Sequence, residues 1–237
     1  MKRIMLLLCL LLIFASVSFA EAQDIRVKCN QFTMNVISEN TRCYQVDDNI
    51  VLDQGASPEA LENSQTANTA IYFLDLEYTN SKIQPQVTFY RVDDLGQTSF
   101  DLLDSSLALS DIINNLKSSY TTVEVAYQNV PFLPYQAAER TVNILPAQID
   151  FANGTGIRTI VSFSDTISSG SSNFNLYYSW QGLSDDGVYY ISAVLPVRSV
   201  TLDGKSVSAV DWSKVDGADF VPSLEQLDYY MHSIVID

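Results

Sequence analysis

The segment from Thr141 to Val197 constrains the fold most, because nearly all of it has the composition of β-strands. Four runs in it are rich in β-branched and aromatic residues. Turn-forming residues, among them Asn153 with Gly154 and Asp185 with Gly187, separate the runs. This pattern predicts an antiparallel meander. Its four strands are expected at residues 142–151, 156–163, 174–180 and 188–197.

Alternation along residues 174–180 predicts that this sheet has two unlike faces. Side chains two residues apart point to the same face of a strand, so the large apolar rings fall on one side. We therefore expect a sheet with one buried face, covered by helices. Phe174, Leu176, Tyr178 and Trp180 share the buried face, and Asn175, Tyr177 and Ser179 share the other.

Two segments have the 3.6-residue period of helices. Residues 107–120 carry an apolar stripe, and the C-terminal segment begins with Ser223 and Gln226 at the spacing of a capping box. Both helices are expected to cover the sheet. The first stripe is Leu109, Ile112, Ile113 and Leu116, and the second is Leu224, Leu227, Met231 and Ile234.

The first half of the chain predicts two smaller strand pairs. Residues 25–29 and 32–37 form one pair, residues 70–78 and 85–92 form a hairpin, and residues 53–69 read as loop. The Phe132–Leu133 pair between two prolines predicts a buried extended crossover. Without internal repeats or a low-complexity linker, we expect a single α+β domain over residues 21–237, an antiparallel sheet covered by two or more helices.

The first twenty residues have the three parts of a secretory signal peptide. Lys2 and Arg3 precede an apolar run over 4–14, and small residues end at Ala20. The run is too short to span a bilayer, so we expect cleavage after Ala20 and a soluble, extracytoplasmic protein that is periplasmic, on the cell surface or secreted. Cys9 lacks the small residue expected before a lipidated cysteine.

Cleavage would leave Cys29 and Cys43 in an oxidising compartment, where a pair of cysteines predicts a disulfide. The bond would close a loop of about fifteen residues, which stabilises the fold by about 3 kcal/mol in the chain-entropy account. Two cysteines without nearby histidines cannot complete a zinc site. His232, the one histidine, stands far along the chain and is expected on the terminal helix as a surface or half-buried residue.

Charge and missing motifs exclude several function classes. The net charge of −15 argues against nucleic acid or anionic lipid as a partner. An unknown protein or a glycan remains as the expected partner, with no integral membrane segment after cleavage. No G-x-S-x-G, P-loop or H-E-x-x-H pattern occurs, so we assign no catalytic residue and expect no cofactor.

Three blocks of sequence carry a resemblance. They are FLP at 132–134, IDFANGTGIR at 149–158 and YSWQGLSDDGVYYISAVLPV at 178–197. The chain resembles a group of exported bacterial proteins of unassigned function that carry a similar QGLxxDGxYYxxAxLPV block. The resemblance covers roughly residues 71–200 and implies a bacterial, secreted, single-domain protein. It implies no activity.

Tyrosines on adjacent strands are the first candidate for a binding site. Aromatic faces with hydroxyl groups suit carbohydrate or peptide ligands. Core packing accounts for Tyr178 and Trp180, which leaves Tyr177 together with Tyr189 or Tyr190 as the predicted exposed patch.

Two loops are further candidates. The turn at 153–156 could present amides to an anion, with Arg158 as a fork-shaped partner. Asp185 and Asp186, with Asp150, are candidate Ca²⁺ ligands, although a hairpin turn explains them without a metal. Asn153 to Thr155 also fits a glycosylation acceptor, which has little meaning in a bacterial protein.

Together these observations favour a non-catalytic exported binding module with an aromatic-rich sheet face. Two alternatives stay open. One is a secreted glycan hydrolase that uses a pair of carboxylates. The other is a structural component of an envelope assembly.

Overall fold

The structure is a computed structural model. It describes residues 24–38, 40–47, 66–76, 84–134, 140–163, 176–199, 202 and 209–237. The predicted signal peptide at 1–20, with Cys9, lies outside the described residues. So do most of the predicted loop at 53–69 and the start of the third meander strand at 174–175.

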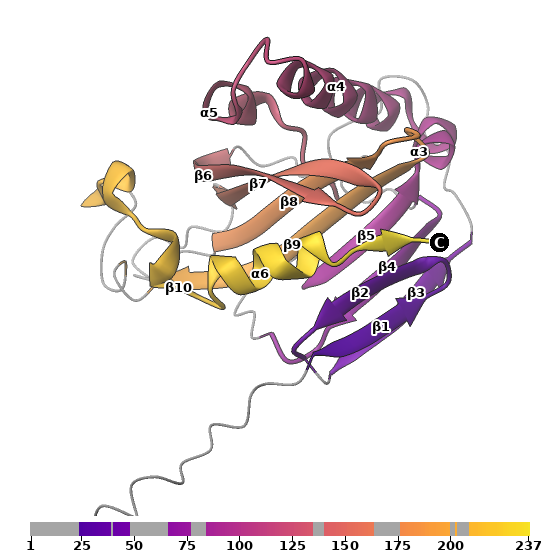
Figure 1. Ribbon diagram of the computed structural model, residues 1–237, viewed down its shortest axis with the longest axis horizontal. Coiled ribbons are helices and arrows are strands. Elements are labelled where there is room, and N and C mark those ends of the chain that lie inside the picture. The colour runs from indigo at the N-terminus through magenta and orange to yellow at the C-terminus, as the bar shows by residue number, and fades with distance from the viewer. Residues whose placement is uncertain are drawn as a thin grey trace, which may run out of the picture.

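An eight-stranded antiparallel sheet forms the centre of the fold (Figure 1). Its strands run in the order β3-β4-β5-β9-β8-β7-β6, and β10 pairs with β9 off this path. The predicted meander is confirmed, because β6 to β9 each pair with the next. Its strands are β6 (Arg140–Phe151), β7 (Gly154–Phe163), β8 (Leu176–Ser184) and β9 (Tyr189–Ser199).

The hairpin predicted in the first half of the chain extends the same sheet. β4 and β5 pair with each other, and β5 pairs with β9, so the two halves of the chain share one sheet. The edge strand β3 was not predicted. The added strands are β3 (Thr41–Val46), β4 (Asn68–Phe73), β5 (Gln86–Arg91) and β10 (Phe220–Val221).

A three-stranded sheet joins the two ends of the described chain. The predicted pair of β1 (Ile25–Cys29) and β2 (Phe32–Val36) forms around Asn30, whose φ of 56° suits an asparagine in a tight turn. The C-terminal strand β11 (Val235–Ile236) adds to β2. The predicted disulfide between Cys29 and Cys43 is present, and it ties β1 to the edge strand β3. Such a bond is typical of proteins in an oxidising compartment.

Helices α3 to α5 cover one face of the central sheet. The helix predicted at 107–120 is α4, but it begins at Phe100, because the side chain of Ser99 caps it by accepting from the amide of Asp101. Its predicted stripe does face the sheet: Leu109 and Ile113 are buried. The elements on this side are α3 (Val92–Thr98), α4 (Phe100–Lys117), α5 (Val123–Ala126) and the 3₁₀ turn η2 (Tyr127–Asn129).

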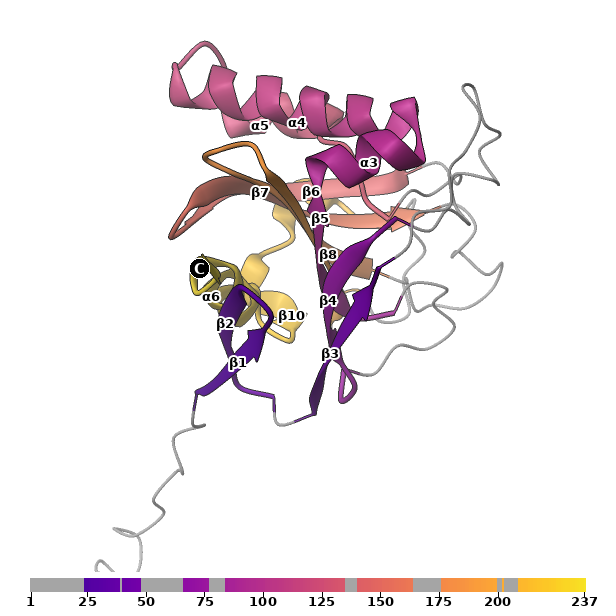
Figure 2. The ribbon, with the colours of Figure 1, turned by 90° about the vertical axis from the view of Figure 1, so that its right-hand side faces the viewer.

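The opposite face is covered as well, so the prediction of a single buried face is wrong. Figure 2 shows α6 and the β1–β2 pair on one side of the central sheet, and α3, α4 and α5 on the other. In β8 every residue except Leu183 is buried. The remaining elements are η6 (Trp212–Lys214), η7 (Gly217–Asp219) and α6 (Leu224–His232).

The predicted cap of α6 is confirmed in one of its two arms. The Ser223 hydroxyl accepts from the amide of Gln226 at 3.2 Å. The Gln226 side chain donates to the Tyr230 hydroxyl at 2.7 Å instead of returning to the cap. Leu224, Leu227 and Met231 are buried, as their spacing predicts.

Trp180 fixes the packing of the meander on the α6 face. Its indole lies over Gly156 and Gly182, which are partners on β7 and β8. A Cβ at either glycine would come within 2.3 Å of the ring. Because no side chain fits there, these two glycines of the resemblance blocks serve close packing. The indole N–H donates to the carbonyl of Ile149 at 3.3 Å.

The described part of the chain holds no helix that is both long enough and apolar enough to cross a membrane.

Candidate functional site

The predicted aromatic patch does not lie on the surface at two of its three tyrosines. Tyr177 is 1% exposed and Tyr190 is 0% exposed. Both point to the face that α3 to α5 cover, where Tyr190 joins the core beneath α4 and Tyr177 packs with Val161 and Phe163. The prediction of exposed rings is wrong there, because alternation separates two faces without showing that only one is covered.

Tyr189 lies on the other face and is partly buried by the β1–β2 pair. Its ring meets Phe32 edge-on at 5.2 Å, and its hydroxyl accepts from Gln31 at 3.0 Å. Tyr178 and Trp180 are buried, as predicted. The three candidate tyrosines are therefore not one contiguous surface.

A buried hydrogen-bond network occupies the α4 face near Tyr190. Gln181 Oε1 accepts from the Tyr190 hydroxyl at 2.8 Å and from the amide of Leu133 at 3.2 Å. Gln181 Nε2 donates to the hydroxyls of Ser192 and Ser179. This network holds the extended crossover, in which Leu133 is buried as predicted. Residues from the blocks at 132–134 and 178–197 thus meet in the core.

The candidate Ca²⁺ ligands are engaged in turn and surface contacts. Asp185 forms an ion pair with Lys117 at 2.7 Å. Asp186 accepts from the Ser184 hydroxyl and from the amide of Val188, two bonds that lower the pKa of its carboxyl. Asp150 accepts from Gln148. Within the described ranges, no group of three or more His, Cys, Asp or Glu residues is placed to hold a metal ion.

The turn at 153–156 also makes structural contacts. The Asn153 carbonyl accepts from Asp185, and its side chain accepts from the amide of Ile236. Arg158, predicted to act with this turn, instead extends from β7 toward α6, where it lines a cleft.

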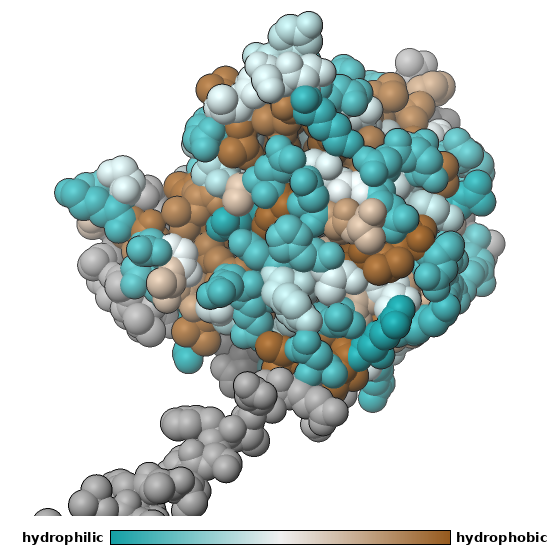
Figure 3. All heavy atoms as spheres, in the orientation of Figure 1, coloured by the Kyte–Doolittle hydropathy of each residue, from teal (hydrophilic) through white to brown (hydrophobic). Residues whose placement is uncertain are grey.

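This cleft has a volume of about 600 Å³, within the usual size of small-ligand sites. We call it the α6 cleft. Most of its lining comes from α6 and its N-cap, and β7 and η7 supply the rest. In Figure 3 hydrophilic side chains cover much of the face on which α6 lies. The lining residues are Arg158, Gly217, Ala218, Ser223, Leu224, Glu225, Asp228, Tyr229 and His232.

Three polar groups meet at the inner wall of the cleft. The Arg158 Nε lies 3.4 Å from Asp228 Oδ1, and their side chains are 12% and 23% exposed. The Tyr178 hydroxyl donates to the same Oδ1 at 2.9 Å. Arg158 Nε is buried and has no hydrogen-bond partner. Among the described residues, Thr33, Thr88 and Asn143 also hold a buried side-chain atom without a hydrogen bond, so the cleft is defined by its lining and not by this atom.

Burial controls the titration of this cluster. Desolvation raises the pKa of Asp228 above that of an ordinary aspartate, although Arg158, Tyr178 and His232 act in the opposite direction. Desolvation also raises the pKa of Tyr178 well above 10, and the charge of Asp228 raises it further. Tyr178 therefore remains a neutral donor at all physiological pH values.

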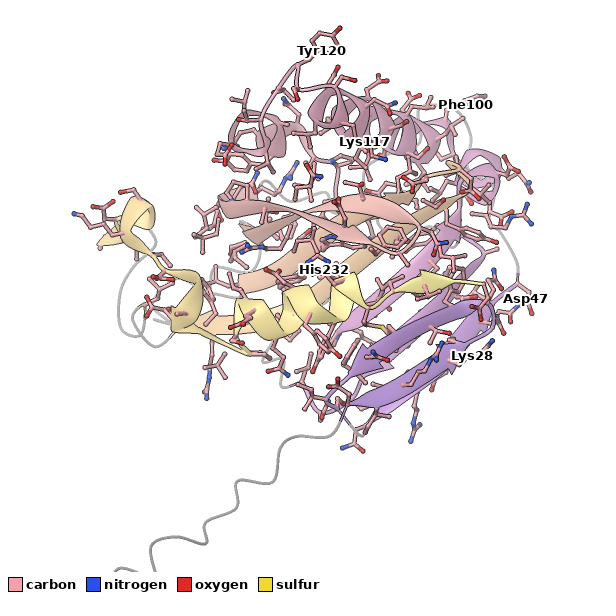
Figure 4. All side chains as sticks on the ribbon, viewed as in Figure 1. Lys28, Asp47, Phe100, Lys117, Tyr120 and His232 are labelled. Atoms are coloured by element: carbon pink, nitrogen blue, oxygen red, sulfur yellow. A yellow bond between two sulfur atoms is a disulfide. The ribbon has the colours of Figure 1, made fainter. Side chains whose placement is uncertain are left out.

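His232 stands at the far end of the cleft, on the side of α6 toward β6 and β7 (Figure 4). Its Nδ1 lies 2.5 Å from the carbonyl oxygen of Asp150. Because a carbonyl only accepts, Nδ1 carries the hydrogen, and in the neutral ring Nε2 is left as an acceptor. His232 is exposed, as predicted.

Both carboxylates that line the cleft lie on the same wall. Glu225 and Asp228 are both on α6, one turn apart. A glycoside hydrolase places its two carboxyl groups on either side of the scissile bond. This arrangement therefore gives the hydrolase alternative no geometric support.

Sequence reasoning found Arg158 but missed its partner Asp228 and the cleft itself. One signal was present: Asp228 directly follows Leu227 and stands four residues after Leu224, so it borders the buried stripe of α6. An acid in that position needs a partner from the sheet.

Comparison with known proteins finds no matching family model, no matching curated protein and no matching solved structure.

Proposed function

We propose that this chain is an exported, non-catalytic binding protein and that it holds its ligand in the α6 cleft. The observation that carries the proposal is the Arg158 guanidinium, which lines a cleft of ligand size and whose Nε makes an ion pair but no hydrogen bond with Asp228. The Cys29–Cys43 disulfide supports the part of it that concerns export. The leader at residues 1–20 belongs to the same proposal.

The surroundings of the cleft suit binding. β7 pairs with β6 on one side and β8 on the other, so the backbone at Arg158 is fixed on both sides. α6 is anchored by a capped N-terminus and a buried apolar face. A rigid scaffold that presents polar groups to an open cleft favours recognition of a ligand.

The test is to fill the cleft without disturbing the core. Ala218 is exposed and lines the cleft, so Ala218→Trp places a large ring in it. Ala108→Trp, at an exposed alanine of α4, is the matched control. The mature chain and both variants are screened by protein-observed NMR against a panel of neutral and acidic oligosaccharides and cell-envelope peptides.

We expect at least one panel member to shift resonances around Arg158 and α6 in the wild type and in Ala108→Trp. The same ligand should lose at least about tenfold in affinity in Ala218→Trp. A panel without any binder, or a binder indifferent to Ala218→Trp, overturns the proposal.

A further inference from the structure

The chemistry of the α6 cleft narrows its ligand, and the argument rests on the proposed function. Arg158 is the cation on its inner wall, and a guanidinium offers five N–H donors in a rigid fork. Its partner in the described part of the chain is Asp228, which it meets in an ion pair without a hydrogen bond at Nε. The protein itself therefore does not supply hydrogen-bond acceptors for all N–H donors of this guanidinium.

Asp228 binds the guanidinium of Arg158 only weakly. It shares Oδ1 with the Tyr178 hydroxyl, which lies closer, at 2.9 Å against 3.4 Å. An anionic group entering the cleft can bond to Arg158 while Asp228 keeps its bond to Tyr178. Guanidinium pairs best with flat, two-oxygen acceptors such as carboxylates, and also with phosphates.

The acidic surroundings favour a carboxylate over a phosphate. Asp228 and Glu225 both line the cleft, and the chain has a net charge of −15. A phosphate with about two charges meets roughly twice the repulsion that a singly charged carboxylate meets. One carboxylate balances one guanidinium.

The rest of the lining favours a sugar as the carrier of that carboxylate. The polar lining residues between Ser223 and His232 span about 13 Å along the axis of α6, at a rise of 1.5 Å per residue. A hydroxyl, a carboxylate, a phenol ring and an imidazole acceptor line this length, at Ser223, Glu225, Tyr229 and His232. These groups suit ring hydroxyls and a sugar face. A peptide would instead use a sheet edge or an apolar groove, and one wall of this cleft is a helix with a polar face.

We propose that the α6 cleft binds a sugar acid, whose carboxylate pairs with the guanidinium of Arg158 while its ring lies along the polar stripe of α6. Arg158 is then the residue that selects acidic over neutral sugars. Asp228 weakens the binding of acidic sugars, because its negative charge lies next to the carboxylate of the ligand.

The experiment compares two trisaccharides of one linkage, tri-galacturonate and tri-galactose, by calorimetry with the mature chain. Inorganic phosphate and galacturonic acid, which carries a single carboxylate, are the further probes. Arg158→Gln removes the charge, Arg158→Lys keeps the charge without the fork, and Asp228→Asn removes the competing carboxylate. Arg91→Gln, at an exposed arginine of β5, is the matched control, and thermal melts verify folding of every variant.

We expect tri-galacturonate to bind, and tri-galactose to bind at least about tenfold more weakly. Arg158→Gln should weaken the acidic ligand by about 30-fold or more, and Arg158→Lys by less. Asp228→Asn should tighten it several-fold, to about tenfold, an effect that a merely destabilised site cannot produce.

Equal binding of both trisaccharides, lost in Ala218→Trp, overturns the sugar-acid inference and leaves the proposed function standing. Phosphate binding tighter than that of galacturonic acid, the monomer with one carboxylate, overturns the preference for a carboxylate. Tri-galacturonate binding that neither Arg158→Gln nor Ala218→Trp changes overturns the inference and also moves this ligand out of the cleft. Absence of binding by either trisaccharide overturns the inference, while the wider panel decides the proposed function.

Discussion

On the α4 face of the central sheet, Gln181 has hydrogen-bond partners at both of its side-chain polar atoms. On the α6 face, the buried Nε of Arg158 makes an ion pair with Asp228 but no hydrogen bond. Both side chains come from the middle of the meander, on neighbouring strands. The first group is sealed beneath the crossover and α4, and the second borders a cleft.

This difference separates a structural polar cluster from a candidate binding site. A fully satisfied network within a core specifies the packing of the segments that it joins. A guanidinium that lines a cleft and is not fully hydrogen-bonded by the protein has N–H donors left for a ligand. The network at Gln181 should therefore matter for folding, and the cluster at Arg158 for binding.

The largest expected effect is on the sealed face. Gln181→Leu leaves the amide of Leu133 and the hydroxyl of Tyr190 without their acceptor, and each buried orphan costs about 1 to 3 kcal/mol. We expect a loss of about 3 kcal/mol in the free energy of unfolding, measured by urea denaturation. Gln128→Leu, at an exposed glutamine of η2, should change it by less than about 0.5 kcal/mol. A loss below about 1 kcal/mol for Gln181→Leu would contradict the claim that the network at Gln181 stabilises the fold.

An intermediate effect is expected at the cleft. Arg158→Met alone leaves Asp228 partly buried without its cation, which should cost about 2 kcal/mol. The double variant Arg158→Met with Asp228→Asn keeps the bond to Tyr178 and removes both charges. It should unfold within about 1 kcal/mol of the wild type and yet lose the ligand. A double variant less stable than the single one would show that the pair serves folding.

The smallest effect is a pH dependence at Asp228. Its pKa is raised in the folded state by burial, so the folded protein binds more protons than the unfolded chain above about pH 4. The contribution of this group to stability is full below that pH and is lost as pH rises through its folded pKa. The free energy of unfolding of Asp228→Asn, relative to the wild type, should therefore increase between pH 4 and pH 7, by less than about 1 kcal/mol.

Melting curves recorded between pH 4 and pH 8 test this prediction. The free energy of unfolding of Asp228→Asn, relative to the wild type, should rise with pH over this range, because the buried wild-type carboxyl loses its proton at a raised pKa. Glu225→Gln, at an exposed glutamate on the same helix, serves as the control. A relative stability of Asp228→Asn that does not change with pH would contradict a raised pKa at Asp228.

Local patterns in the sequence predicted most of the elements. Alternation of β-branched and aromatic residues gave the four meander strands, and helical spacing gave α4 and α6. The start of α4 was placed too late, because Ser99 caps a turn whose apolar spacing is weaker than that of Leu109 and Ile113. The strand β3 was missed, because most of its side chains are exposed and it lacks an apolar face.

The candidate site was predicted in one residue only. Arg158 stood out as a cation on a strand, but Asp228 lies on the last helix of the chain, and the docking of α6 on β7 brings the two together. The tyrosines differ from this pair. They stand close together in the sequence, but the fold divides them between the two covered faces of the sheet. Docking of helices is decided by many weak contacts at once, so spacing along one segment does not reveal it.

The sequence by itself determined which side chains of each strand stand together, since the two-residue period of an extended backbone is a local property. It also determined the cap at Ser223 and the two cysteines available for a disulfide. Only the tertiary structure decided what covers each face, and hence that Tyr177 and Tyr190 are enclosed while Arg158 borders open space. Burial depends on the complementary surface supplied by distant parts of the chain, and no local period contains that information.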